Sequence, residues 1–234
     1  WDPWSSRNQN LSPDSGITPA SRNVGNEQAM QAAYDRGQVF RGHIDIPVID
    51  WRPYLEPKLD MHHARASFAA RQRIINARGH ARNQLIWITD SDDTNEFDQT
   101  PEAFEVIDAW LDNILANPDK SIDENKPPRA KDRCFDTQGA EIASGDPVWD
   151  GVLNDKAPGV CTALFPVYDT SRTIAGGPFE QSLFKCAFKS VTRAIADGDY
   201  GVWQPTADEQ AQLEKIFPMG VCDYSKPDQA LDKD

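Results

Sequence analysis

The segment EPKLDMHH, residues 56–63, places two carboxylates close to two adjacent histidines. A carboxylate can orient and charge-stabilise an imidazole that acts as a general base toward a serine hydroxyl. Glu56 and Asp60 are therefore candidate catalytic acids, and His62 or His63 is the candidate base. Neighbouring residues at the start of a helix point about 100° apart, so the two histidines cannot both face one site. The alternative is that both acids are solvated and favour the N-terminus of the next helix through its dipole.

Regular elements flank this segment and are expected to position it. Alternating apolar residues in HIDIPVID predict a strand over 43–50, and QLIWIT predicts a buried strand over 84–89. Apolar residues at helical spacing predict helices over 61–78 and 100–115. Strand, helix, strand, helix in this order is typical of an α/β fold with a parallel sheet. The candidate residues would then lie past the carboxyl end of a strand, where such sheets bind ligands.

A second acidic cluster, DSDDTNEFD at residues 90–98, follows the second predicted strand. It loosely resembles a calcium-binding loop, but the loop's glycine and its final glutamate are missing, so a solvated loop is the better interpretation. His43 and His80 have no spacing that would complete a zinc site with the histidine pair. The sequence therefore predicts no metal and no cofactor.

The pattern changes after Asn117, where the charged, proline-bearing stretch 118–133 predicts a linker or an exposed loop. We therefore expect two parts, residues 1–117 and residues 118–234. In the second part, PFEQSLFKCAF predicts one helix, and the capping-box pattern Thr206-x-x-Glu209 predicts the start of another.

Four cysteines, Cys134, Cys161, Cys186 and Cys222, lie in this second part and form no CxxC pair. Zinc ligands usually come in such close pairs, so two disulfides are the better interpretation. Three connectivities are possible, and the most local one, Cys134–Cys161 with Cys186–Cys222, is slightly favoured. Disulfides indicate an oxidising compartment, so we expect a secreted or periplasmic protein.

The composition restricts the classes of partner that the protein is expected to bind. With 24 Lys and Arg against 37 Asp and Glu, the formal net charge of −13 argues against nucleic acid, whose phosphates need basic patches. No apolar run approaches the roughly 18–20 residues of a membrane helix, so no membrane is expected as a partner. The chain opens with Trp1 rather than methionine, and we expect a processed end with more chain upstream.

A serine-type site also needs a nucleophile, and no G-x-S-x-G elbow occurs in the 234 residues. In enzymes with that elbow the catalytic residues follow the order serine, acid, histidine, so a fragment with only the last strands would lack the serine. The absence is consistent with such a fragment, and equally with a protein that is no hydrolase.

Several segments together resemble a known family. They are IPVIDWRPYLEPKLDMHHARASFAARQRI, NQLIW, DRCFD, GVCTALFPVYDTSRTIAGGPFEQSLFKC and IFPMGVCDYSKP. From about residue 24 to 227 the chain resembles the C-terminal half of secreted bacterial proteins of unknown function, which have an α/β-hydrolase character akin to tannase-type and polyester-degrading esterases. The most specific pieces are R-P-Y-x-[ED]…D-x-H and F-P-x-G-V-C-D. In the first, Glu56 matches the acid and His62 the histidine, which favours His62 over His63 as the base.

The resemblance implies a secreted serine-type acyl hydrolase that cleaves an ester of a small molecule, an oligomer or a polymer. Residues 1–117 would form the C-terminal part of an α/β-hydrolase core, and residues 118–234 an irregular disulfide-braced cap. The serine would lie on an N-terminal chain of the same precursor, separated by proteolytic processing and held as a non-covalent partner in a heterodimer. Two alternatives stay open: a non-catalytic binding or structural subunit, and a hydrolase that cleaves amides.

Overall fold

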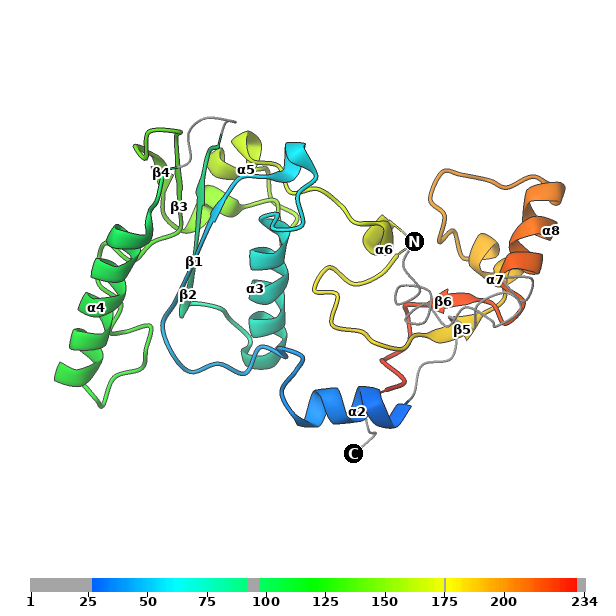
Figure 1. Cartoon of the computed structure of the whole chain (residues 1–234), viewed down its shortest axis with the longest axis horizontal. Helices are drawn as coiled ribbons and strands as arrows, with labels where there is room; N and C mark the ends of the chain where they lie inside the picture. Colours follow the sequence, from blue (N-terminus) through cyan, green and yellow to red (C-terminus); the bar gives the residue numbers. More distant parts are fainter. Residues whose placement is uncertain (1–26, 92–96, 175, 231–234) are drawn as a thin grey trace, which may run out of the picture. The chain divides into compact units, whose positions relative to one another are not determined.

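The computed structural model describes residues 27–91, 97–174 and 176–230, which form a mixed structure of helices and sheets (Figure 1). Contacts divide the chain into two units. The central unit comprises residues 40–182, and the terminal unit combines residues 1–39 with residues 183–234. The predicted boundary after residue 117 falls inside the central unit. Over the described residues, no helix is long and apolar enough to cross a membrane.

The central unit contains a four-stranded sheet in the order β1-β2-β3-β4. Its strands are β1 (Val48–Pro53), β2 (Gln84–Thr89), β3 (Arg133–Phe135) and β4 (Glu141–Ser144). The first three strands run parallel, and β4 is antiparallel to β3. The predicted α/β class and the predicted strand over 84–89 are therefore confirmed. The two short strands β3 and β4 extend the sheet beyond the two predicted strands.

The first strand begins five residues later than predicted. Pro47 precedes it and has no N–H to contribute to a ladder. The carbonyls of Ile44 and Ile46 accept instead from the side chain of Asn83, at 3.3 and 2.9 Å. The regular pairing with β2 starts at Val48.

Helices cover both faces of the sheet (Figure 1). The helices and 3-10 turns of this unit are η1 (Glu56–Lys58), α3 (Arg65–Arg78), α4 (Thr100–Ala116), η2 (Asp146–Trp149), α5 (Val160–Leu164) and α6 (Ser171–Ile174). Side chains alternate along β2, so Ile86 shares a core cluster with Phe68 of α3, and Trp87 shares another with Trp110 of α4. All six residues of β2 are buried, which makes this strand the centre of the core.

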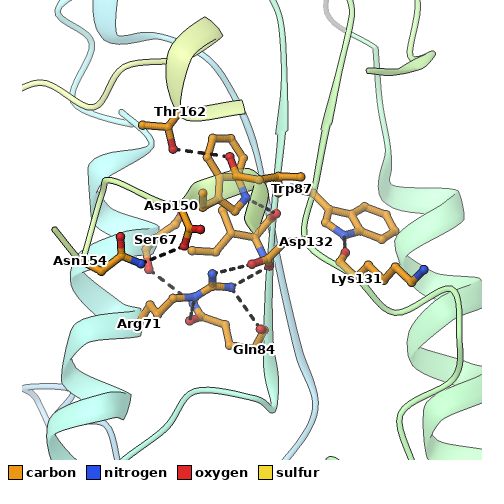
Figure 2. A network of polar contacts seen from close by, with 12 residues as sticks. Ser67, Arg71, Gln84, Trp87, Lys131, Asp132, Asp150, Asn154 and Thr162 are labelled. Carbon is orange, nitrogen blue, oxygen red and sulfur yellow. Dashed lines mark hydrogen bonds and ion pairs between the residues drawn. The ribbon is translucent and has the colours of Figure 1, made fainter. Parts of the chain in front are cut away.

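A partly buried ion pair joins α3 to the sheet. Arg71 Nη1 donates to Asp132 Oδ2 at 2.7 Å, and Nη2 donates to Asp132 Oδ1 at 2.8 Å (Figure 2). Asp132 Oδ1 also accepts from Ile86 N at 2.8 Å, and Arg71 Nη2 donates to Gln84 O at 3.1 Å. Charges that are paired and also hydrogen-bonded to backbone are suited to burial. This network fixes α3 and the chain before β3 against β2.

Two disulfides have the predicted local pairing. Cys134 on β3 is bonded to Cys161 on α5, within the central unit. Cys186 is bonded to Cys222, within the terminal unit. Each bridge therefore braces one unit, and together they indicate an oxidising environment.

Over its described residues, the terminal unit contains a two-stranded antiparallel sheet and three helices. They are α2 (Glu27–Asp35), β5 (Ala187–Lys189), α7 (Val191–Ala196), α8 (Ala207–Ile216) and β6 (Val221–Asp223). The predicted capping box at Thr206 is confirmed at the start of α8. The helix predicted for PFEQSLFKCAF is wrong, because its last residues enter β5 and pair with β6 beside the Cys186–Cys222 bridge.

Candidate functional site

The segment between β1 and α3 carries the predicted acids and histidines at the carboxyl end of β1. Backbone pairing extends one residue beyond the strand, where Tyr54 N donates to Thr89 O at 2.8 Å. The turn η1 follows, and Leu59 ends it in the left-handed region with φ 53°. A leucine adopts this conformation at a cost on the order of 1–2 kcal/mol. The turn brings Asp60 within hydrogen-bonding distance of His62.

Asp60 and His62 form a hydrogen-bonded pair. Asp60 Oδ1 accepts from His62 N at 2.7 Å and from His62 Nδ1 at 2.9 Å. An ionised carboxylate can only accept, so Nδ1 carries a proton, and in the neutral form of the ring Nε2 is then the proton acceptor. These two bonds, the backbone bond foremost, hold the pKa of Asp60 below its usual value. The His62 side chain is 73% exposed, so Nε2 is open to a reacting group.

Glu56 is buried, with 2% of its surface exposed, and its carboxylate is bonded to the start of α3. Its Oε1 accepts from Arg65 N at 3.3 Å at the start of the helix. Ala64, the N-cap residue, offers no side-chain cap, so the carboxylate satisfies a free N–H of the first turn instead. Burial raises the pKa of Glu56. Backbone hydrogen bonds to its carboxylate, and separately the electrostatic influence of His63, offset part of that rise.

A pocket of about 170 Å³ lies between this segment and the chain that precedes α6. It is lined by Glu56, Leu59, Asp60, His63, Tyr168, Asp169 and Thr170. His63 faces this pocket, whereas His62 is not among its walls. The two adjacent histidines thus have different surroundings, as the geometry of a helix start leads one to expect. The predicted residues Glu56 and Asp60 share the pocket, and His62 meets it through its bond to Asp60.

Arg65 contacts the segment 168–169, which forms the far wall of this pocket. Its Nη1 donates to Tyr168 O at 3.1 Å and lies 3.5 Å from Asp169 Oδ1. The guanidinium stacks on Phe179, with Cζ 3.9 Å from the ring centroid. Among the described residues, Arg65 Nε, Arg65 Nη2 and Glu56 Oε2 are buried without a hydrogen-bond partner. Buried polar atoms are usually paired, so this concentration of unpaired atoms beside one pocket is informative.

A second pocket, of about 240 Å³, lies at the carboxyl ends of β1 and β2. It is lined by Tyr54, Pro57, Lys58, Asp90, Ser91, Ile142, Leu164 and Phe165. Tyr54 Oη donates to Pro166 O at 2.7 Å, and Ser91 Oγ donates to Tyr54 O at 2.8 Å. Burial raises the pKa of the Tyr54 hydroxyl above its ordinary range. Aromatic and aliphatic walls at this edge of a parallel sheet suit the apolar part of a ligand.

Sequence reasoning missed one wall of the first pocket. Tyr168, Asp169 and Thr170 are about a hundred residues from the histidine pair, and no motif spacing links the two segments. Most of the acidic cluster 90–98 lies outside the described residues, so its comparison with a calcium loop stays a prediction. Within the described ranges, no group of three or more His, Cys, Asp and Glu side chains could hold a metal ion.

A family model described as a tannase-like family of unknown function (DUF6351) matches residues 10–233. No curated protein and no solved structure matches the chain. The matched range covers nearly the whole chain and agrees with the resemblance of the sequence segments.

Proposed function

Because the chain belongs to this tannase-like family, whose function is unknown, we propose that it is the acid–base part of a secreted ester hydrolase. His62 is the general base, and Asp60 orients it. One observation carries the proposal: His62 Nδ1 donates to Asp60 Oδ1 at 2.9 Å, which leaves Nε2 free just past the end of a parallel strand. Asp60 thereby takes the role that the sequence pattern gave to Glu56, whose Oε1 is bound to the start of α3.

The chemistry follows from this geometry. His62 Nε2 accepts the proton of a serine hydroxyl as the serine oxygen bonds to the ester carbonyl carbon, and Asp60 stabilises the imidazolium that forms. When the tetrahedral intermediate collapses, the bond to the alcohol oxygen breaks and that oxygen takes the proton from Nε2. Water then attacks the acyl-enzyme with the same proton transfers, which releases the acid and restores the serine.

We assign the serine to a separate chain of the same precursor. No nucleophile elbow occurs in the 234 residues, which supports this assignment. The sheet offers a place for such a chain, because β1 is an edge strand over the described residues. An unpaired edge presents N–H and C=O groups that can pair with a further strand. The two disulfides favour a secreted or periplasmic location for the complex.

A fluorophosphonate probe tests the proposal, because it phosphonylates activated serines. The protein is produced from its whole gene and purified with any polypeptide that accompanies it. We expect labelling of a serine on a companion chain, and a loss of about 10²–10⁴-fold in labelling rate for His62→Ala. His63→Ala is the matched control and should label normally.

Three outcomes would contradict the proposal. Hydrolysis of p-nitrophenyl butyrate by material that resists labelling at pH 8 would exclude the serine mechanism. Absence of both hydrolysis and labelling would favour the non-catalytic subunit. Faster cleavage of the matching p-nitroanilide than of the ester would favour an amide hydrolase.

A further inference from the structure

The carboxylates that line the 170 Å³ pocket differ in how fully their oxygens are hydrogen-bonded. Asp60 is held by His62, and Asp169 accepts from Thr173 Oγ1 at 3.2 Å and lies near Arg65. Glu56 uses only Oε1, because its Oε2 is buried without a partner among the described residues. A buried carboxylate oxygen that no group of the protein satisfies carries a desolvation cost that a bound ligand would offset.

The charge of the pocket restricts that ligand. Three carboxylates line it, and its walls contain no lysine or arginine among the described residues. The nearby guanidinium of Arg65 is not one of the walls, and its Nη1 donates to Tyr168 O. An anionic group would therefore be repelled. A neutral hydroxyl would satisfy one hydrogen bond but would leave the buried negative charge uncompensated.

We propose that this pocket binds a primary ammonium group of the substrate. An ammonium offers three N–H donors and a positive charge, which match the three carboxylates among the walls, those of Glu56, Asp60 and Asp169. A cavity of about 150 Å³ accommodates a benzene molecule, so this pocket has room for about six heavy atoms. The inference rests on the proposed function, and it makes the substrate a cationic ester, formed from an amino alcohol or an amino acid.

The position of the pocket supports this interpretation of the substrate. Asp60 belongs both to the pocket wall and to the pair with His62. An ammonium bound against Glu56 would therefore lie within a few bonds of an ester carbonyl that is presented to His62 Nε2. The net charge of −13 would also draw cationic esters to the protein.

Binding of ethanolamine, measured by saturation-transfer NMR and calorimetry without any hydrolysis, tests the inference. Ethylene glycol is the matched neutral probe, because it replaces the ammonium by a hydroxyl of similar size. Tetramethylammonium is the second control, because it has the charge without N–H donors. We expect ethanolamine to bind at least ten-fold more tightly than either control.

The matched variants are Glu56→Gln and Glu105→Gln. The amide that replaces the Glu56 carboxylate would retain an acceptor for Arg65 N, so the fold should survive, and circular dichroism and thermal melting check this. We expect Glu56→Gln to weaken ethanolamine binding about ten-fold or more, and the exposed Glu105→Gln to leave it unchanged. No ethanolamine binding, equal binding of either control probe, or an unaffected Glu56→Gln would each overturn the inference. Ethanolamine binding with no serine labelling would instead sink the proposed function alone.

Discussion

Two polar clusters at the same helix differ in how completely their atoms are hydrogen-bonded. Arg71 and Asp132 make two short hydrogen bonds to each other, and each also bonds to the backbone of β2 (Figure 2). Arg65 and Glu56 also meet at α3, yet three of their buried polar atoms have no partner among the described residues. The first cluster is complete without a ligand, and we attribute it to stability. The second adjoins a pocket, and we attribute its unpaired carboxylate oxygen, Glu56 Oε2, to binding.

The largest loss of stability is expected for Arg71→Met. Removing the guanidinium leaves Asp132, whose side chain is only 12% exposed, as a largely desolvated charge without its cation. The free energy of unfolding should fall by about 3–5 kcal/mol, measured by urea denaturation followed by tryptophan fluorescence. Arg129→Met is the control, because that side chain is 60% exposed and its ion pairs should contribute less than about 1 kcal/mol. Equal losses for the two variants would contradict a structural role for the Arg71 cluster.

A smaller loss is expected when the Cys134–Cys161 bridge is removed by a double change to serine. The bridge joins β3 to α5 across a separation of 27 residues, close to the Asp132 network. Its removal should cost about 2–4 kcal/mol, largely because the unfolded chain gains freedom. Thermal unfolding with and without the change measures the loss. An unchanged melting temperature would show that the packing around β3 holds this region without the bridge.

Arg65→Met should cost about 1 kcal/mol or less, which is the sharpest contrast with Arg71→Met. The change removes the bond to Tyr168 O, but it also removes two buried N–H groups that have no partner. The methionine side chain can still pack on Phe179, as the arginine does. Urea denaturation compares the two variants directly. A loss as large as that of Arg71→Met would mean that both clusters are structural.

The pH dependence of stability gives the smallest effect. Burial raises the pKa of Glu56, so the folded protein keeps this proton at a pH where the unfolded chain has lost it. The contribution of Glu56 to stability is therefore greatest below the usual glutamate value of 4.5 and falls as the pH rises through the raised pKa. Glu56→Gln cannot titrate, so it should gain stability relative to the wild type as the pH rises above the usual glutamate value of 4.5. A difference that is independent of pH in unfolding experiments would contradict a buried, raised Glu56.

The sequence predicted those parts of the molecule whose signals are local. The strand over 84–89 is apolar throughout because both its faces are covered, and the helix from Thr100 begins with proline at its first turn. The most local cysteine pairing, slightly favoured among three possible ones, is the pairing that the structure has. The short strands β3 and β4 carry no such signal, since three or four residues are too few to establish a period.

The sequence predicted only one of the two segments that form the pocket, residues 56–63. Glu56, Asp60 and the two histidines lie within eight residues, so the sequence could group them. It could not tell which acid bonds His62, because that depends on the left-handed conformation of Leu59. Tyr168, Asp169 and Thr170 reach the pocket through the Arg65 contacts, which only the folded chain creates.

The relative activity of His62→Ala and His63→Ala tests the central claim most directly. These neighbours differ in surroundings: one pairs with Asp60 in solvent, and the other faces the 170 Å³ pocket. With p-nitrophenyl butyrate as substrate and the native complex as enzyme, kcat/KM should fall about 10²–10⁴-fold for His62→Ala and less than about ten-fold for His63→Ala. A larger loss for His63→Ala, with His62→Ala still active, would contradict the assignment of the Asp60–His62 pair as the acid–base unit.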